Sequence, residues 1–245
     1  MSGTKSTPDE QRRIRPNRRA FTETQIVDAA LALLDEGGVA AVSIRSVATR
    51  LGVNPNAIYT YVASRADLER AVVERVLGAA QLARLTDPDP EWRTAIIEFA
   101  LELRTLLLEH PAVATLLMSA PMDGVAARDL GEALLDCLAR GGLSAADGAR
   151  AAYAIMVQTI GSVALEVAET DGKPPLSPES ERITLRRTAL DTIDGDRWPH
   201  TRSSTDVMAQ WISADQFAWG LRALLDGLPE KSGRPAKFGS DEGAA

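Results

Sequence analysis

The sequence predicts an all-α protein. Hydrophobic residues make up 45% of the 245 residues and aromatic residues only 4%. Alanine and leucine are common and alternating Val/Ile/Thr stretches are few, which favours helices over strands. Several capped segments carry apolar residues three and four positions apart, the repeat of one helical face. A chain of this length can bury a sizeable core in one or two domains.

The first predicted helix begins after Thr22. Thr22 and Gln25 have the spacing of a capping box, and Phe21 and Ile26 occupy the positions of a hydrophobic staple. Apolar residues at helical spacing follow, and two glycines at 37–38 end the segment. We expect this helix to pack behind the next stretch and support it.

Residues 43–62 predict two helices of about eight residues joined by a tight turn. Ser43 is a good N-cap, and Gly52 favours the left-handed backbone that ends a helix. Asn54 and Pro55 then have the order of an N-cap and a first helical residue. This arrangement is typical of a helix-turn-helix unit, whose second helix enters the major groove of DNA. Helical proteins that bind no DNA also contain short helices around a glycine.

The distribution of charge favours the DNA-binding interpretation. The net charge is −7, but residues 1–65 hold nine Lys/Arg and six Asp/Glu, a net +3. The remaining residues hold eighteen and twenty-eight, a net −10. Phosphate contacts need a local basic face, and an acidic remainder would help to orient the molecule on DNA.

The stretch from Thr22 to Leu68, TETQIVDAALALLDEGGVAAVSIRSVATRLGVNPNAIYTYVASRADL, resembles the DNA-binding domain of the TetR family of transcriptional regulators. The shared features are the Gly-Gly helix end, the Ser43 cap, the Leu-Gly-Val turn at 51–53, Tyr59 in the second helix and Ser-Arg at 64–65. The resemblance covers about fifty residues. It implies a three-helix head that reads DNA and a helical body that binds a small molecule.

Few residues of the second helix are strong base readers. No Arg or Lys lies between Asn54 and Val62, so sequence reading is expected to depend on Asn56, Tyr59 and Thr60. Ile58 and Val62 are expected to face the core. The predicted DNA-contacting residues are Ser43, Arg45, Asn54, Asn56, Ala57, Tyr59, Thr60, Tyr61 and Arg65.

The predicted domains are a basic disordered arm over 1–20, a DNA-binding domain over 21–66, a helical effector-binding and dimerisation domain over 67–228, and a disordered tail over 229–245. The arm is either solvated or adds phosphate and minor-groove contacts. Beyond the head, helices are expected at 64–85, 91–109, 112–118, 123–140, 145–169, 178–190 and 214–226. Ser177 is expected to cap the helix at 178–190 within an otherwise mobile loop over 170–205.

The segments EWRTAIIEFALELRTLLLEHPAV and FAWGLRALLDGL resemble the regulatory domain of the tetracycline-repressor branch. This resemblance implies that the helices at 145–169 and 214–226 pair with those of a second copy in a homodimer. Ordinary intrachain core is the alternative for both apolar stripes. The resemblance also implies an effector pocket between body helices. The residues expected to line it are Trp92, Phe99, Leu103, Met118, Leu134, Tyr153 and Met156.

The tetracycline site itself is poorly matched. By the same resemblance, Gln81 and Leu117 replace two functional histidines and Phe99 replaces a drug-binding asparagine, while Glu166 falls near an acidic residue. We therefore expect a fairly apolar effector, without magnesium and without a cofactor.

The sequence gives little support for an enzyme, a secreted protein or a membrane protein. The chain has two histidines and one cysteine, and we find no paired metal-ligand spacing, nucleophile elbow or phosphate-binding loop, so an enzyme is not expected. Cys137 is a small buried residue or a redox-sensing thiol. We find no run of 18 apolar residues and no secretory signal, which favours the cytoplasm.

The sequence thus predicts a ligand-responsive repressor that binds a palindromic operator as a homodimer. The alternative is a helical interaction or small-molecule-binding protein without DNA binding. Salt dependence separates the two, because binding to phosphates weakens steeply as salt rises.

Overall fold

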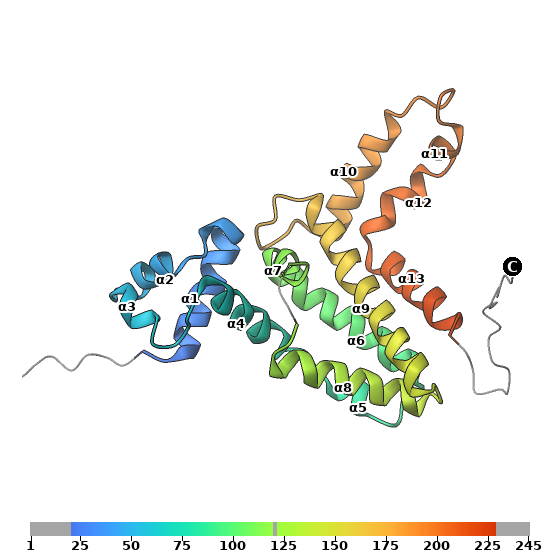
Figure 1. Cartoon of the computed structure of the whole chain (residues 1–245). Coiled ribbons are helices and arrows are strands. Elements are labelled where there is room, and N and C mark those ends of the chain that lie inside the picture. Colours follow the sequence, from blue (N-terminus) through green and yellow to red (C-terminus); the bar gives the residue numbers. More distant parts are fainter. Residues whose placement is uncertain (1–20, 120–121, 229–245) are drawn as a thin grey trace, which may run out of the picture.

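The computed structural model describes residues 21–119 and 122–228, and all regular elements in these ranges are helical (Figure 1). The all-α prediction is therefore confirmed. The helices of the N-terminal half are α1 (Glu23–Gly37), η1 (Val39–Ala41), α2 (Ile44–Leu51), α3 (Pro55–Ile58), α4 (Arg65–Leu77), α5 (Ala83–Thr86), α6 (Trp92–Glu109) and α7 (Pro111–Leu117). Those that follow are α8 (Val125–Arg140), α9 (Ala145–Ala168), α10 (Glu179–Asp191), α11 (Pro199–Ser203), α12 (Thr205–Ala209), η2 (Gln210–Ile212) and α13 (Ala214–Asp226).

The molecule has a small head and a larger body (Figure 1). We call residues 21–64, with α1 to α3, the head, and residues 83–228, with α5 to α13, the body. Helix α4 connects them by packing against α1 on one side and against α7 and α8 on the other. The inner face of α1 buries Ile26 and Leu34 completely, and α4 contributes Leu68 and Val72 to the same core. The predicted arm over 1–20 and tail over 229–245 lie outside the described residues, and the domain boundary at residue 66 stays a prediction.

Helix α4 is shorter than the sequence predicted. It ends at Leu77 instead of continuing to residue 85, and the chain turns before the single turn of α5. The turn lets Leu85 become fully buried where α5 packs on α6 and α8. Arg140 of α8 donates a hydrogen bond to the Leu85 carbonyl and holds that turn. Burial of one leucine against two helices thus outweighs continuation of the helical pattern.

The segment after α9 is also more ordered than predicted. Helix α10 matches the helix predicted at 178–190, but α11 forms inside the loop expected over the rest of 170–205, and α12 and η2 follow where no helix was predicted. Pro178, not Ser177, is the N-cap of α10, without a side-chain cap. Helix α10 buries none of its own residues, yet it packs on α12, and both project from the body (Figure 1). The Arg186 Nε donates to the Met208 carbonyl oxygen at 2.9 Å and ties the two helices together.

Helix α9 lies at the centre of the body. It packs against α6, α7, α8 and α13. Among the described helices, α9 alone has the length and composition to cross a membrane, with a mean hydropathy of 1.5 over its most apolar window. The prediction from the absence of an 18-residue apolar run overlooked this helix. Its contacts with four others give it the place of a core helix of the body.

Candidate functional site

The helix-turn-helix unit is held by side-chain caps at each helix start. The Ser43 Oγ accepts from the backbone N–H of Ser46 at 3.0 Å, and the Ser46 Oγ accepts from the Ser43 N–H at 2.9 Å. The Asn54 Oδ1 accepts from the Asn56 N–H at 2.9 Å, with Pro55 in the first turn. These bonds satisfy amides that a helix start leaves without partners.

The turn between α2 and α3 depends on one glycine. Gly52 has φ 66° and ψ 32°, in the left-handed region where residues with a Cβ are strained. The structure corrects the predicted length of the second helix, because α3 has four residues and residues 59–61 form a turn. The chain bends at Tyr59, and Ile58 and Val62 are both buried beneath it as predicted.

The outer face of this unit is polar and open. Arg45, Asn56 and Tyr59 are exposed, and none of the three side chains has a hydrogen bond within the described part of the chain. Tyr59 is 53% exposed while Ile58 beside it is 0% exposed. A groove of about 1100 Å³ opens at this end of the head. It is lined by Phe21, Gln25, Leu51, Gly52, Val53, Asn54, Asn56, Ala57, Thr60 and Tyr61.

Other predicted contact residues already have structural partners. The Tyr61 hydroxyl donates to the Phe21 carbonyl oxygen at 2.8 Å, and the two rings lie 5.3 Å apart. The Thr60 hydroxyl donates to the Ala57 carbonyl oxygen at 2.7 Å. The Arg65 guanidinium bonds to Glu69 at 2.7 Å and to the Val39 carbonyl oxygen at 2.8 Å. The structure therefore divides the predicted set into free side chains and side chains that hold the head together. Phe21 and Gln25 were not predicted, because only tertiary packing brings the start of α1 to this groove.

Five of the seven residues predicted to line an effector pocket lie in or against the core, and the other two are exposed. Phe99, Leu103 and Leu134 are at most 3% exposed and belong to the core. Trp92 is half-buried against Gly141, and Met156 is half-buried on α9. Met118 and Tyr153 do not join them, since they are 65% and 74% exposed. None of the seven is among the lining residues of the groove of the head, of the cavity between α6 and the α9–α10 segment, or of the three cavities beside the C-terminal half of α9.

A buried cluster of charges lies on the inner side of α9, where the sequence had indicated an isolated Glu166. The Glu166 carboxylate accepts from the Arg104 Nε at 3.1 Å, from the Arg104 Nη2 at 2.8 Å and from the Arg182 Nη1 at 2.7 Å. Glu179 accepts from the Arg104 Nη2 at 2.9 Å. Glu166 and Arg104 are 3% and 7% exposed, so this acid is neutralised inside the protein.

Several polar contacts join the head and α4 to the body. Glu74 of α4 accepts from the backbone N–H groups of Ala126 and Ala127 at 2.8 and 3.3 Å, at the start of α8. His110, between α6 and α7, lies 2.9 Å from the Asp35 Oδ2 of α1. Burial raises the pKa of Asp35, and the hydrogen bond to His110 partly opposes that rise. The sequence did not predict this contact between His110 and Asp35.

Metal and thiol chemistry have little basis in the described residues. No group of three or more His, Cys, Asp or Glu side chains in these ranges could hold a metal ion. Cys137 is buried and free, and burial raises the pKa of its thiol. A thiol with a raised pKa is a poor nucleophile at neutral pH. The reading of Cys137 as a small buried residue is the one that this geometry favours.

Comparison with known proteins places both halves of the chain. Residues 26–72 match the family model of bacterial regulatory proteins of the tetR family, and residues 86–232 match the tetracyclin repressor-like C-terminal domain. An HTH-type transcriptional regulator of Saccharopolyspora erythraea is 35% identical over 65% of each chain. The Escherichia coli tetracycline repressor protein class A from transposon 1721 is 29% identical over 84% of this chain and 89% of that one. The structure of BioQ with its natural double-stranded DNA operator is 26% identical, with a TM-score of 0.60 over 85% of this chain and 98% of that one.

Proposed function

The chain belongs to the TetR family of bacterial regulatory proteins, with a DNA-binding and a ligand-binding domain, and we propose that it is a transcriptional repressor. In this proposal it binds a palindromic operator in the cytoplasm as a homodimer and leaves that operator when a small molecule binds the body. The observation that carries the proposal is the outer face of the head, where Arg45, Asn56 and Tyr59 are exposed on a unit with a buried back.

We assign different roles to the free and the engaged side chains of the head. Asn56 can read adenine in the major groove, and Ala57 can contact a thymine methyl group. Arg45 and the Tyr59 hydroxyl are placed to reach phosphates or base edges. Ser43, Asn54, Thr60, Tyr61 and Arg65 would act mainly by holding the backbone, although their outer atoms can still meet the duplex.

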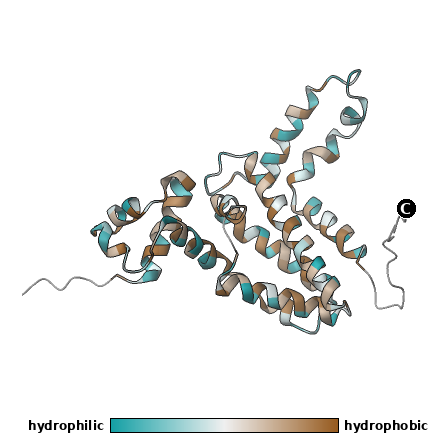
Figure 2. Cartoon of the chain, viewed as in Figure 1, coloured by the Kyte–Doolittle hydropathy of each residue, from teal (hydrophilic) through white to brown (hydrophobic). Residues whose placement is uncertain are grey.

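The homodimer proposal is supported by apolar residues that this chain leaves uncovered. Tyr153, Val157 and Leu165 of α9 are 74%, 52% and 73% exposed, and Trp219 of α13 is 64% exposed. Hydrophobic residues run along both helices (Figure 2). An uncovered apolar face of this kind marks an interaction surface. A second copy would bury it and place two heads on successive turns of DNA, about 34 Å apart.

For the effector we propose a fairly apolar molecule without a metal. The core residues Phe99, Leu103 and Leu134 are closely packed here, so binding would require the helices around them to separate. Glu166 is neutralised by two arginines and is therefore poorly suited to a magnesium–drug complex. The contacts of Glu74 and His110 would carry a movement of the body to the head.

A band-shift titration tests the proposal. Purified protein would be titrated on duplexes from upstream of its own gene at about 50 and 200 mM salt, with and without a panel of apolar metabolites and antibiotics. We expect binding to one short palindrome that weakens steeply with salt. Arg45→Ala and Tyr59→Ala should each weaken it about tenfold or more, whereas Arg128→Ala, an exposed arginine of α8 outside the proposed dimer helices, should not. Failure to bind any duplex at low salt would favour the alternative of a helical module without DNA binding.

A further inference from the structure

A cavity lies at the junction of the head and the body, apart from the apolar core. Its volume is about 530 Å³. Its wall includes Asp35 from α1, several residues from the last turns of α6, and the segment that connects α9 to α10. The lining residues are Asp35, Arg104, Thr105, Leu108, Glu109, Pro174, Pro175, Leu176, Ser177 and Arg182. A molecule bound here would therefore contact both parts of the protein.

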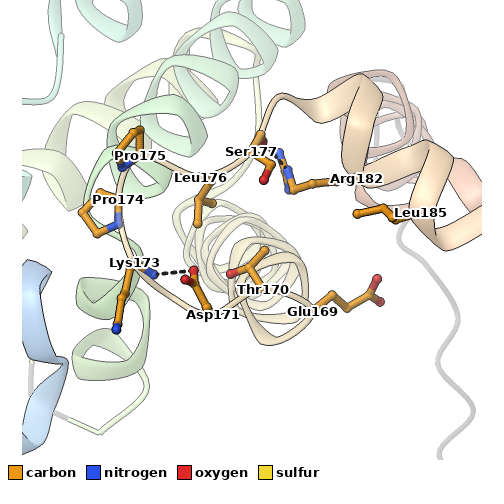
Figure 3. A pocket seen from close by; sticks show the side chains of 10 residues that line it. All are labelled: Glu169, Thr170, Asp171, Lys173, Pro174, Pro175, Leu176, Ser177, Arg182 and Leu185. Atoms are coloured by element: carbon orange, nitrogen blue, oxygen red, sulfur yellow. Dashed lines mark hydrogen bonds between the residues drawn. The ribbon is translucent and has the colours of Figure 1, made fainter.

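The connecting segment supplies an apolar wall. Pro174, Pro175 and Leu176 follow one another along it, and Ser177 lies beside Arg182 (Figure 3). Leu108 of α6 adds a further apolar side chain to the cavity. Lys173 precedes Pro174 and lines an adjoining pocket, which shares residues 174–177 and Arg182 with this cavity. One side of the site can thus hold an alkyl or aryl group.

The two guanidinium groups at the cavity are already neutralised. Arg104 is paired with Glu166 and Glu179, and Arg182 with Glu166. Two carboxylates therefore balance two guanidinium charges within the cluster. Asp35 and Glu109 remain, so the lining residues and their ion-pair partners carry a formal charge of −2 with His110 neutral, and counting Lys173 of the adjoining pocket leaves −1. The sign of this charge favours a cationic ligand over an anionic one.

Asp35 is the lining residue whose carboxylate a cationic ligand would stabilise most. Its Oδ2 contacts His110, but its buried Oδ1 has no hydrogen-bond partner. An unpartnered carboxylate oxygen in a partly buried place is costly, and a charged donor beside it would lower that cost. Because the Oδ1 is buried, a ligand in the cavity would reach it after the carboxylate turns about its χ2 torsion, whose preference is broad.

We propose that this cavity is a second ligand site, for a molecule with a protonated amine next to an apolar group. The amine would lie by Asp35 and Glu109, and the apolar group against Leu108, Pro175 and Leu176. The site goes beyond the proposed function and does not depend on DNA binding. It is also separate from an effector site among the buried residues Phe99, Leu103 and Leu134.

The test is a titration of the full-length protein, labelled at leucine methyl groups, with n-hexylammonium, hexan-1-ol and hexanoate. Hexylammonium should shift the Leu108 and Leu176 signals saturably and leave the Leu134 signals in place. It should bind about tenfold or more tightly than either comparison compound, the usual value of a hydrogen bond to a charged group. Equal binding of the alcohol and the amine, shifts confined to Leu103 and Leu134, or no shift at all would each overturn the proposal.

Two pairs of variants locate the site. Asp35→Asn should weaken hexylammonium about tenfold and leave hexan-1-ol unchanged, whereas Glu36→Gln, whose carboxylate pairs with Arg50 instead, should change neither. Thr105→Trp should block the cavity, while Thr94→Trp on the same helix should not. Because both threonines are exposed, the tryptophans should not prevent folding, and circular dichroism would check this. Unchanged hexylammonium binding by Thr105→Trp would also overturn the proposal.

Discussion

The caps that start the helices of the head are bonds to backbone groups two or three residues away, whereas the buried charges of the body bond to partners far along the chain. Ser43 caps through Ser46 and Asn54 through Asn56. Arg104, by contrast, bonds to Glu166, 62 residues away, and to Glu179, 75 residues away. The difference shows that the head's turn is specified locally, while the body's charged cluster exists only once several helices have packed.

The largest expected effect lies in that cluster. Glu166→Leu removes the carboxylate that pairs with both Arg104 and Arg182, so Arg182 loses its ion-pair partner and Arg104 keeps only Glu179. Removing one partner of a buried ion pair typically costs about 3–5 kcal/mol. Urea unfolding at a fixed protein concentration would measure the loss. Glu132→Leu on the exposed face of α8 is the control, expected within about 0.5 kcal/mol of the original chain. A loss below about 1 kcal/mol would mean that the cluster contributes little to stability.

The next effect tests the turn of the head. A Cβ on Gly52 or on Gly131 would meet no atom within 4 Å, but only Gly52 has a positive φ. Gly52→Ala should therefore destabilise the protein by about 1–2 kcal/mol through its backbone alone. Gly131→Ala, inside α8, should stabilise it by about 0.5–1 kcal/mol. Thermal unfolding of both variants would compare them, and a change of the same sign in both would contradict the argument.

Two tyrosines separate structure from recognition within the head. Tyr61→Phe loses the hydrogen bond to the Phe21 carbonyl and should cost about 1 kcal/mol of stability. Tyr59→Phe removes a hydroxyl with no partner in the described residues, so its stability should not change. Its affinity for operator DNA should instead fall about threefold to tenfold. Parallel unfolding and band-shift measurements check both, and a loss of stability in Tyr59→Phe would show that its hydroxyl is not free.

The smallest effect is a pH dependence with opposite signs at two neighbouring carboxyl groups. The raised pKa of Asp35 means that the folded protein holds this proton more tightly than the unfolded chain does. Its contribution is therefore most favourable below the unfolded pKa and is lost as pH rises through the folded pKa. Hydrogen bonding to Arg50 lowers the pKa of Glu36, so its contribution is lost as pH falls. Unfolding measured from pH 3 to pH 7 should show a steeper gain of stability with pH in Asp35→Asn and a shallower gain in Glu36→Gln.

Local sequence patterns predicted most of the helices, including those of the helix-turn-helix unit. The caps at Thr22, Ser43, Asn54 and Ser144 start the helices predicted after them, because each bond joins residues within one turn. The predictions that were wrong concern places where a distant partner decides. Leu85 lies in α5, where it is buried, instead of in a longer α4. Helix α12, which was not predicted, packs against α10. The effector-binding residues stay a prediction. Sequence periodicity alone could not show that Tyr153 is exposed and Phe99 is buried.

The sequence by itself determined the helical class, the capped helix-turn-helix unit and the family of the protein, since these depend on residues close in the chain. Only the tertiary structure decided that Glu166 is neutralised by Arg104 and Arg182, that His110 meets Asp35, and that a cavity opens between head and body. The physical reason is the distance along the chain between the residues that interact. A cap or a turn is stabilised by atoms a few residues apart, whereas burial of a charge depends on which helices the whole chain packs around it.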